Sequence, residues 1–182
     1  MNHPRTQPEV LVLMGVAGCG KTTVAAVLSG RLDWPFEEGD ALHPQSNVEK
    51  MRSGHPLTDE DRQPWLETVA TWVEECLDAG SNGLITCSAL KRSYREIINR
   101  RGHGVKFVYL HGSHELIAER LATRHGHFMP PSLLDSQFAT LQEPAPDEPA
   151  VRIEIGGSPS AIANDIIKAL GLQANTGNKE TS

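Results

Sequence analysis

The sequence has little of what several protein classes require. Among its 182 residues are three cysteines, Cys19, Cys76 and Cys87, which are too few and too scattered for a disulfide framework or a zinc site. Their odd number fits a reducing compartment. No apolar run approaches the ~20 residues of a membrane helix, and residues 1–8 lack the apolar core of a signal peptide. We therefore expect a cytoplasmic protein that does not bind a membrane.

An excess of positive charge is also missing. The formal net charge is −6, and Lys and Arg form no runs. Such a surface does not attract nucleic acid or anionic lipid, so any anion that the protein binds must be held by a local site. The contents of charged residues, 22%, and hydrophobic residues, 38%, are those of an ordinary globular protein. The length suits one domain.

Short apolar runs alternate with segments of helical spacing along the whole chain. Strands are expected at 9–14, 34–38, 83–87, 105–110 and 151–155, and helices at 22–32, 43–52, 59–79, 91–101, 113–123, 132–141 and 159–170. This alternation predicts an α/β fold, with a parallel sheet covered by helices on both faces. The domain should extend over residues 1–172, and the polar residues 173–182 should form a disordered tail.

The strongest motif lies between the first expected strand and the first helix. The segment reads Gly15-Val16-Ala17-Gly18-Cys19-Gly20-Lys21-Thr22 and matches G-x-x-x-x-G-K-[ST] at every fixed position. Glycines let such a loop curl so that its N–H groups face a phosphate at a helix N-terminus. Lys21 is predicted to reach the β- and γ-phosphates of ATP, and the Thr22 hydroxyl to bind Mg²⁺. Thr23 is included in the nucleotide site.

The phosphate loop alone does not say what happens to the nucleotide. The base-reading motif Asn-Lys-x-Asp of GTPases is absent, and the strand that ends at Cys87 carries no Asp-Glu pair of a mechanical ATPase. These absences favour a kinase of a small metabolite. The alternative from a different class is a regulatory module that binds ATP without turnover.

Two carboxylates follow the second expected strand. Asp40 can accept the proton of an acceptor hydroxyl, and Glu38 can order the metal and its water. Capping of the next helix is the alternative role for Asp40. Further along, Arg120 and Arg124 are four residues apart, so they share one face of a helix. A solvated surface is their alternative role.

The sequence resembles the gluconokinase family from about residue 10 to residue 143. The resemblance is carried by Gly39-Asp40-Ala41-Leu42-His43-Pro44, Asp61-Arg62, Pro64-Trp65-Leu66, Cys87-Ser88-Ala89-Leu90-Lys91, Gly126-His127-Phe128, and Gln137 with Thr140-Leu141-Gln142-Glu143-Pro144. It implies a three-layer P-loop kinase fold with strand order 2-3-1-4-5 and a lid at about residues 121–133. It also implies transfer of a phosphoryl group from ATP to D-gluconate, often in a homodimer. With it, Arg120 and Arg124 are assigned to the nucleotide, and Arg124 also to catalysis.

Gluconate is a carboxylate on a chain of hydroxyls, so its pocket needs cations and hydrogen-bonding groups. Such groups are offered by Asp40, His43, Asn47, Lys50, Arg52, Lys91, Arg95 and His127. The alternative role of His127 is to hold the lid closed, and that of His43, before Pro44, is to cap a turn. By the resemblance, Asp40 faces the 6-hydroxyl. Lys91 and Arg95 bind either the acid or the transferred phosphoryl group, and the sequence does not decide which. A shikimate or nucleotide kinase is the alternative enzyme.

The phosphate loop departs from the family at two positions. Related enzymes tend to carry Ser where this chain has Ala17 and Cys19, and they often carry Asp where it has Glu38. Cys19 stands beside Lys21 at a helix N-terminus, which favours a reactive thiolate that Mg-ATP would protect. The alternative is that Cys19 points into the fold as a packing residue. Cys76 and Cys87 lie on apolar stripes and should react slowly.

Overall fold

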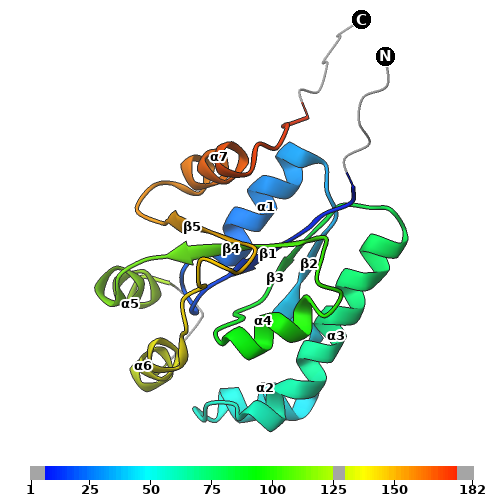
Figure 1. The fold of residues 1–182 in the computed structure, drawn as a ribbon. Coiled ribbons are helices and arrows are strands. Elements are labelled where there is room, and N and C mark those ends of the chain that lie inside the picture. The colour runs from blue at the N-terminus through cyan, green and yellow to red at the C-terminus, as the bar shows by residue number, and fades with distance from the viewer. Residues whose placement is uncertain (1–6, 125–129, 176–182) are drawn as a thin grey trace, which may run out of the picture.

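A computed structural model describes residues 7–124 and 130–175, with a parallel five-stranded sheet at its centre (Figure 1). The strands are β1 (Val10–Met14), β2 (Phe36–Glu38), β3 (Gly83–Thr86), β4 (Val105–His111) and β5 (Ala150–Glu154). Their order is β2-β3-β1-β4-β5, and each neighbouring pair is parallel. The predicted fold class and strand order are confirmed.

Helices follow the strands as the sequence pattern predicts. They are α1 (Lys21–Leu32), α2 (Gln45–Arg52), α3 (Asp59–Asp78), α4 (Arg92–Ile98), α5 (His114–Ala122), α6 (Pro131–Thr140) and α7 (Pro159–Leu170). Helix α4 is shorter than expected because a turn follows it, in which Gly102 has a φ of 76° and Gly104 a φ of 78°. A short 3₁₀ turn at Gly39–Leu42 was not predicted.

The three central strands, β3, β1 and β4, are buried on both faces, which gives the sheet two hydrophobic cores. Alternate residues of β1 point to opposite sides. Leu11 and Leu13 face α1 and α7, whereas Val12 and Met14 face α3 and α4. Figure 1 shows these two pairs of helices on either side of the sheet. Such complete burial explains why β1 reads as a continuous apolar run.

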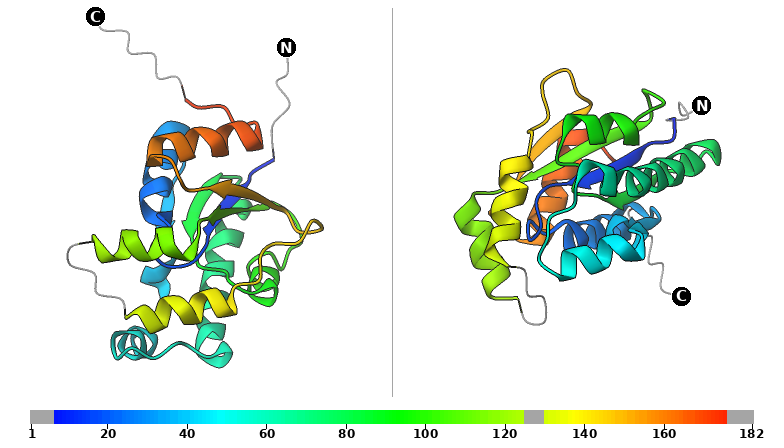
Figure 2. Two further views of the ribbon diagram at one scale, coloured as in Figure 1. Left: turned by 90° about the vertical axis from the view of Figure 1, so that its left-hand side faces the viewer. Right: turned by 90° about the horizontal axis from the view of Figure 1, so that it is seen from below.

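The parallel topology brings the ends of three strands to the same edge of the sheet. Strand β1 ends at the phosphate loop, β2 ends at Gly39-Asp40, and β3 ends just before Ser88. In Figures 1 and 2, α6 lies between α5 and α2 beyond this edge. The edge is where open α/β sheets bind ligands. Over the described ranges, the structure has no helix long and apolar enough to cross a membrane.

Candidate active site

The phosphate loop has the backbone conformation that its glycines permit. The φ angle is 145° at Gly15, 80° at Gly18 and 96° at Gly20, which directly precedes α1. Any side chain at Gly18 would also collide with Leu121 of α5, because an added Cβ would lie 2.6 Å from the leucine Cγ. The loop therefore curls at the N-terminus of α1 with α5 packed against it, as a phosphate site requires.

The ammonium group of Lys21 lies against this loop. Its Nζ donates to the carbonyl oxygens of Gly15, at 2.9 Å, and Val16, at 3.1 Å. Among the described residues, no carboxylate forms a salt bridge with Lys21. Its positive charge is held by neutral groups only and is available to a phosphate.

Oxygen donors gather at the other end of the loop. The Thr22 hydroxyl donates to Glu38 Oε2 at 2.8 Å, and the Thr86 hydroxyl donates to Glu38 Oε1. Hydroxyl and carboxylate oxygens are the ligands that Mg²⁺ prefers in kinases. Thr22 and Glu38, both predicted as metal residues, are therefore brought together, and their chemistry fits Mg²⁺.

The turn that carries Asp40 is fixed from several sides. A Cβ at Gly39 would lie 1.8 Å from the Thr86 carbonyl oxygen, so only glycine fits there. The Gly39 N–H donates to Thr86 Oγ1 at 3.2 Å, and Trp65 Nε1 donates to the Gly39 carbonyl at 2.8 Å. The His43 N–H donates to the Asp40 carbonyl at 3.3 Å. The Asp40 carboxylate is left exposed at the edge of the sheet.

An open cavity of about 910 Å³ extends from the phosphate loop to α2, α3 and α6. Its walls include seven residues of the predicted nucleotide and substrate sites, namely Ala17, Gly18, Lys21, Asp40, His43, Arg52 and Arg124. It also includes Arg62 and Gln137, which the sequence reasoning did not assign. The cavity joins a phosphate site to a carboxylate and to several cations.

His43 lines the cavity, and Asn47 lies behind it. The His43 ring stacks on Trp65 with centroids 4.0 Å apart. Asn47 is buried, and its Nδ2 donates to the Asp61 carbonyl at 2.8 Å and contacts His43 Nδ1 at 3.3 Å. Because an amide nitrogen only donates, Nδ1 accepts and the ring proton sits on Nε2. Burial lowers the pKa of His43, against the opposing effect of Asp40, so the ring is neutral. Asn47 thus orients His43 and does not line the cavity.

Three of the predicted cations are engaged with carboxylates and do not line the cavity. Lys50 Nζ lies 2.6 Å from Asp61 Oδ2, and Lys91 Nζ lies 3.1 Å from Asp59 Oδ1. Arg95 is 2% exposed. Its guanidinium donates to both carboxylate oxygens of Glu148, at 2.6 and 3.1 Å, and to the Ala89 carbonyl at 2.9 Å. These three cations therefore form ion pairs within the protein.

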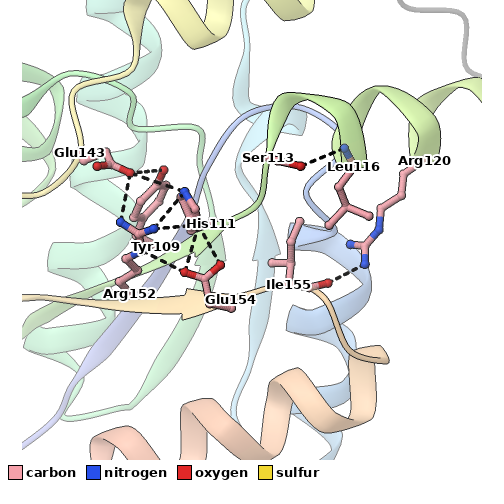
Figure 3. Close-up of polar contacts among 9 residues, drawn as sticks. All are labelled: Tyr109, His111, Ser113, Leu116, Arg120, Glu143, Arg152, Glu154 and Ile155. Atoms are coloured by element: carbon pink, nitrogen blue, oxygen red, sulfur yellow. Dashed lines mark hydrogen bonds and ion pairs between the residues drawn. The ribbon is translucent and has the colours of Figure 1, made fainter.

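The remaining predicted residues divide between two places. Arg124 lies at the cavity wall, while Arg120 Nη2 donates to the carbonyl of Ile155 at 2.5 Å, at the end of β5 (Figure 3). Thr23 is exposed in the first turn of α1. His127 lies outside the described residues. The expectation that Arg120 and Arg124 share one face of a helix is wrong, because α5 ends at Ala122 and Arg124 lies beyond it.

Arg62 is a cavity residue that sequence reasoning missed. Its Nη1 donates to the Leu57 carbonyl at 2.6 Å and to the Tyr94 hydroxyl at 3.2 Å, and the guanidinium packs 5.5 Å from the centre of the Tyr94 ring. The only signal in the sequence was its place in the Asp61-Arg62 pair that carries the resemblance. Nothing local indicates that this arginine, among many, faces the cavity.

The structure corrects the expectation for Cys19. Its side chain is 0% exposed and packs beneath Gly15, in the same core as Leu13 and Val24. A buried thiol is not accessible to a reagent in solution, so the structure does not support the predicted reactive thiolate at Cys19. The alternative reading, a small packing residue, is the one observed.

The combination of a phosphate loop, a 2-3-1-4-5 parallel sheet and an acceptor cavity with a carboxylate defines a P-loop kinase of small molecules. Residues 10–144 match the protein family described as an AAA domain. The chain is 51% identical to the gluconokinase of Gluconobacter oxydans, over 89% of this chain and 91% of that protein. It is 43% identical to the thermoresistant gluconokinase of Escherichia coli, over 80% and 83%. The chain belongs to the gluconokinase family.

Solved structures agree with this assignment. A gluconokinase from Sinorhizobium meliloti superposes with a TM-score of 0.82 at 41% identity, over 90% of this chain and 92% of that chain. An APS kinase from Mycobacterium tuberculosis shares the fold alone, with a TM-score of 0.64 at 17% identity over 91% and 98%.

Proposed function

We propose that this protein is an ATP-dependent gluconokinase, which transfers the γ-phosphoryl group of ATP to the 6-hydroxyl of D-gluconate. The products are ADP and 6-phospho-D-gluconate. The observation that carries the proposal is one cavity whose walls include the phosphate loop with Lys21, Asp40 and Arg62. Family membership supplies the identity of the acceptor.

At the donor end, the phosphate loop and Lys21 hold the triphosphate. Thr22 and Glu38 would hold Mg²⁺, which supplies charge neutralisation at the β- and γ-phosphate oxygens. Lys21 stabilises the charge that grows as the γ-phosphoryl group leaves. Arg124, which lines the cavity, would meet the same charge. Arg120, which donates to the Ile155 carbonyl after β5, would hold the nucleotide there.

At the reacting centre, Asp40 accepts the proton of the 6-hydroxyl while that oxygen forms its bond to the γ-phosphorus. The bond from this phosphorus to the bridging oxygen breaks, and ADP leaves. His43, neutral with its proton on Nε2, can donate a hydrogen bond to a neighbouring hydroxyl of the acceptor. The fixed turn at Gly39 holds Asp40 in place, which lowers the entropic cost of the approach.

Arg62, which lines the same cavity, is suited to bind the gluconate carboxylate. Its Nη1 is occupied by Leu57 and Tyr94, whereas Nε and Nη2 have no partner within the described ranges. A guanidinium edge of this kind matches a carboxylate with two parallel hydrogen bonds. This role replaces the one that the sequence offered to Lys91 or Arg95.

The proposed enzyme also has a lid, forms a homodimer and works in the cytoplasm. A lid at residues 121–133 is supported by Leu121, Arg124, Pro130 and Leu133, which line the cavity at the ends of that segment. A homodimer and a cytoplasmic location come from the family resemblance and from the low cysteine content. Light scattering on the purified protein tests the homodimer.

An acceptor panel tests the function directly. ADP formation is measured with gluconate, glucose, shikimate and nucleoside monophosphates, each with Mg-ATP. We expect phosphorylation of gluconate far above the other acceptors, because glucose lacks the carboxylate that Arg62 meets. Equal rates on gluconate and glucose, or a preference for shikimate, would overturn the assignment.

A further inference from the structure

One side chain of α6 forms a hydrogen bond with the backbone of the phosphate loop. The Ala17 N–H donates to Gln137 Oε1 at 2.7 Å, although 120 residues separate the two in sequence. Both residues line the cavity. We propose that Gln137 is a positioning residue, which fixes the phosphate loop through Ala17 in the shape that receives ATP. This inference rests on the proposed nucleotide site.

Helix α6 is a firm support for such a contact, because the segment just after it is hydrogen-bonded to the loop before α4 and to strand β4. The Gln142 N–H donates to the Leu90 carbonyl, in the loop before α4, at 2.7 Å. The Gln142 side chain is not part of this support, because its Oε1 accepts from the Arg92 N–H at the start of α4, at 3.0 Å. Figure 3 shows the next tie, in which the Tyr109 hydroxyl donates to Glu143 at 3.0 Å and Arg152 approaches the same carboxylate. Gln137 is less than two turns from these anchors.

The contact uses one N–H of the loop and leaves others for the phosphates. The Cys19 N–H donates to the Val16 carbonyl at 3.3 Å. The N–H groups of Gly18 and Gly20 have no acceptor among the described residues. Since buried or ligand-facing N–H groups need partners, these two are available to phosphate oxygens. Gln137 thus satisfies Ala17 from the side of the acceptor cavity and does not compete with ATP.

The position of Gln137 also links the two substrates. Leu133 and Ser136 of the same helix line the acceptor cavity. On this proposal the bond persists when ATP binds and reacts, so its loss should weaken ATP binding equally in the ground state and the transition state. Such uniform binding appears in KM and not in kcat.

The first test compares Gln137→Met with Gln142→Met. Both substitutions replace a glutamine that accepts a backbone N–H by a side chain of similar length without an acceptor, but only the first touches the phosphate loop. For Gln137→Met we expect the KM for ATP to rise roughly five- to tenfold, the loss of about one hydrogen bond, with kcat within about twofold. For Gln142→Met both constants should stay within about twofold. Equal changes in the two variants, or a lower KM for ATP in Gln137→Met, would overturn the proposal.

The second test uses the wild-type protein and needs no turnover. Amide hydrogen exchange is followed by NMR with and without a non-hydrolysable ATP analogue and Mg²⁺. The Ala17 amide should be protected in both states, whereas Gly18 and Gly20 should gain protection only with the analogue. An Ala17 amide that exchanges freely without nucleotide would refute the role of Gln137. The result is independent of gluconate, so a failure of the proposed acceptor would be seen separately in the panel above.

Discussion

Thr22 and Glu38 lie 2.8 Å apart, hydroxyl to carboxylate, although one closes the phosphate loop and the other ends β2. The contact exists because the parallel sheet brings the ends of β1 and β2 to one edge, with β3 between them. Thr86 of β3 donates to the other oxygen of the same carboxylate. Three chain segments thus converge on one oxygen-rich point beside the phosphates.

Glu38→Gln should weaken Mg²⁺ binding in the active enzyme. The amide keeps a hydrogen bond to Thr22 but loses the charge that attracts the cation and its water. We expect the Mg²⁺ concentration for half-maximal activity to rise about 10- to 100-fold, the usual cost of losing a group that orients metal ligands. Activity titrated with Mg²⁺ at constant ATP measures it. The control is Glu37→Gln, the adjacent residue of β2 on the opposite face. An unchanged Mg²⁺ requirement in Glu38→Gln would contradict the metal role.

Asp40→Asn should slow phosphoryl transfer and leave nucleotide binding nearly unchanged. The amide cannot accept the proton of the 6-hydroxyl, so kcat should fall by roughly 10²–10⁴. Binding of an ATP analogue, measured by calorimetry, should stay within about twofold, because Asp40 lies on the acceptor side. Asp33→Asn is a matched control at the far end of α1, where asparagine also tolerates the φ of 56°. Near-normal kcat in Asp40→Asn would make Asp40 a structural residue of the 3₁₀ turn.

Arg62→Met should weaken gluconate binding without weakening ATP binding. Methionine keeps much of the packing on Tyr94 but removes the guanidinium edge, so the KM for gluconate should rise about 10- to 100-fold, as for a lost charged hydrogen bond. The KM for ATP should not change. Lys91→Met is the control, since the Lys91–Asp59 pair is partly exposed and worth little. A larger effect on gluconate from Lys91→Met than from Arg62→Met would restore the role that the sequence suggested.

The sequence predicted what depends on local pattern. The phosphate loop follows from a motif, the alternation of strands and helices from periodicity, and the strand order from the family resemblance. The carboxylates Glu38 and Asp40 follow from their place at the end of β2. The sequence could not tell which cations face the substrate, because their partners are remote. Arg95 meets a carboxylate 53 residues away and Lys91 one 32 residues away. A buried charge such as Arg95 persists only with such a partner, and no spacing in the sequence reveals it.

Asp61 should contribute stability that is lost in acid. Hydrogen bonds from Lys50, and next from the Thr58 backbone, lower its pKa to about 2. A folded-state pKa below the unfolded value of about 3.9 means that the contribution is complete above pH 4 and vanishes as the pH falls toward 2. Asp61→Asn should therefore be less stable than wild type at pH 6, and the difference in melting temperature should shrink by pH 2. Glu60→Gln, one residue earlier on α3, should show no such convergence. A constant difference across this range would remove Asp61 from the acid-sensitive groups.

The rate at which each cysteine is labelled should follow the burial of its thiol and not its closeness to the positive charge at the phosphate loop. Cys19 and Cys87 are 0% exposed, and Cys76 is partly exposed on α3. Burial raises the pKa of Cys87 to about 12 and also raises that of Cys76, so every thiol should react slowly in the folded protein. During brief alkylation, peptide mapping should find Cys76 labelled first, with no loss of kinase activity. Cys76→Ser should then remove nearly all of the early label, while all three cysteines should react in guanidinium. Early modification of Cys19 that Mg-ATP prevents would instead mean that the phosphate loop opens in solution far enough to expose the thiol beneath Gly15.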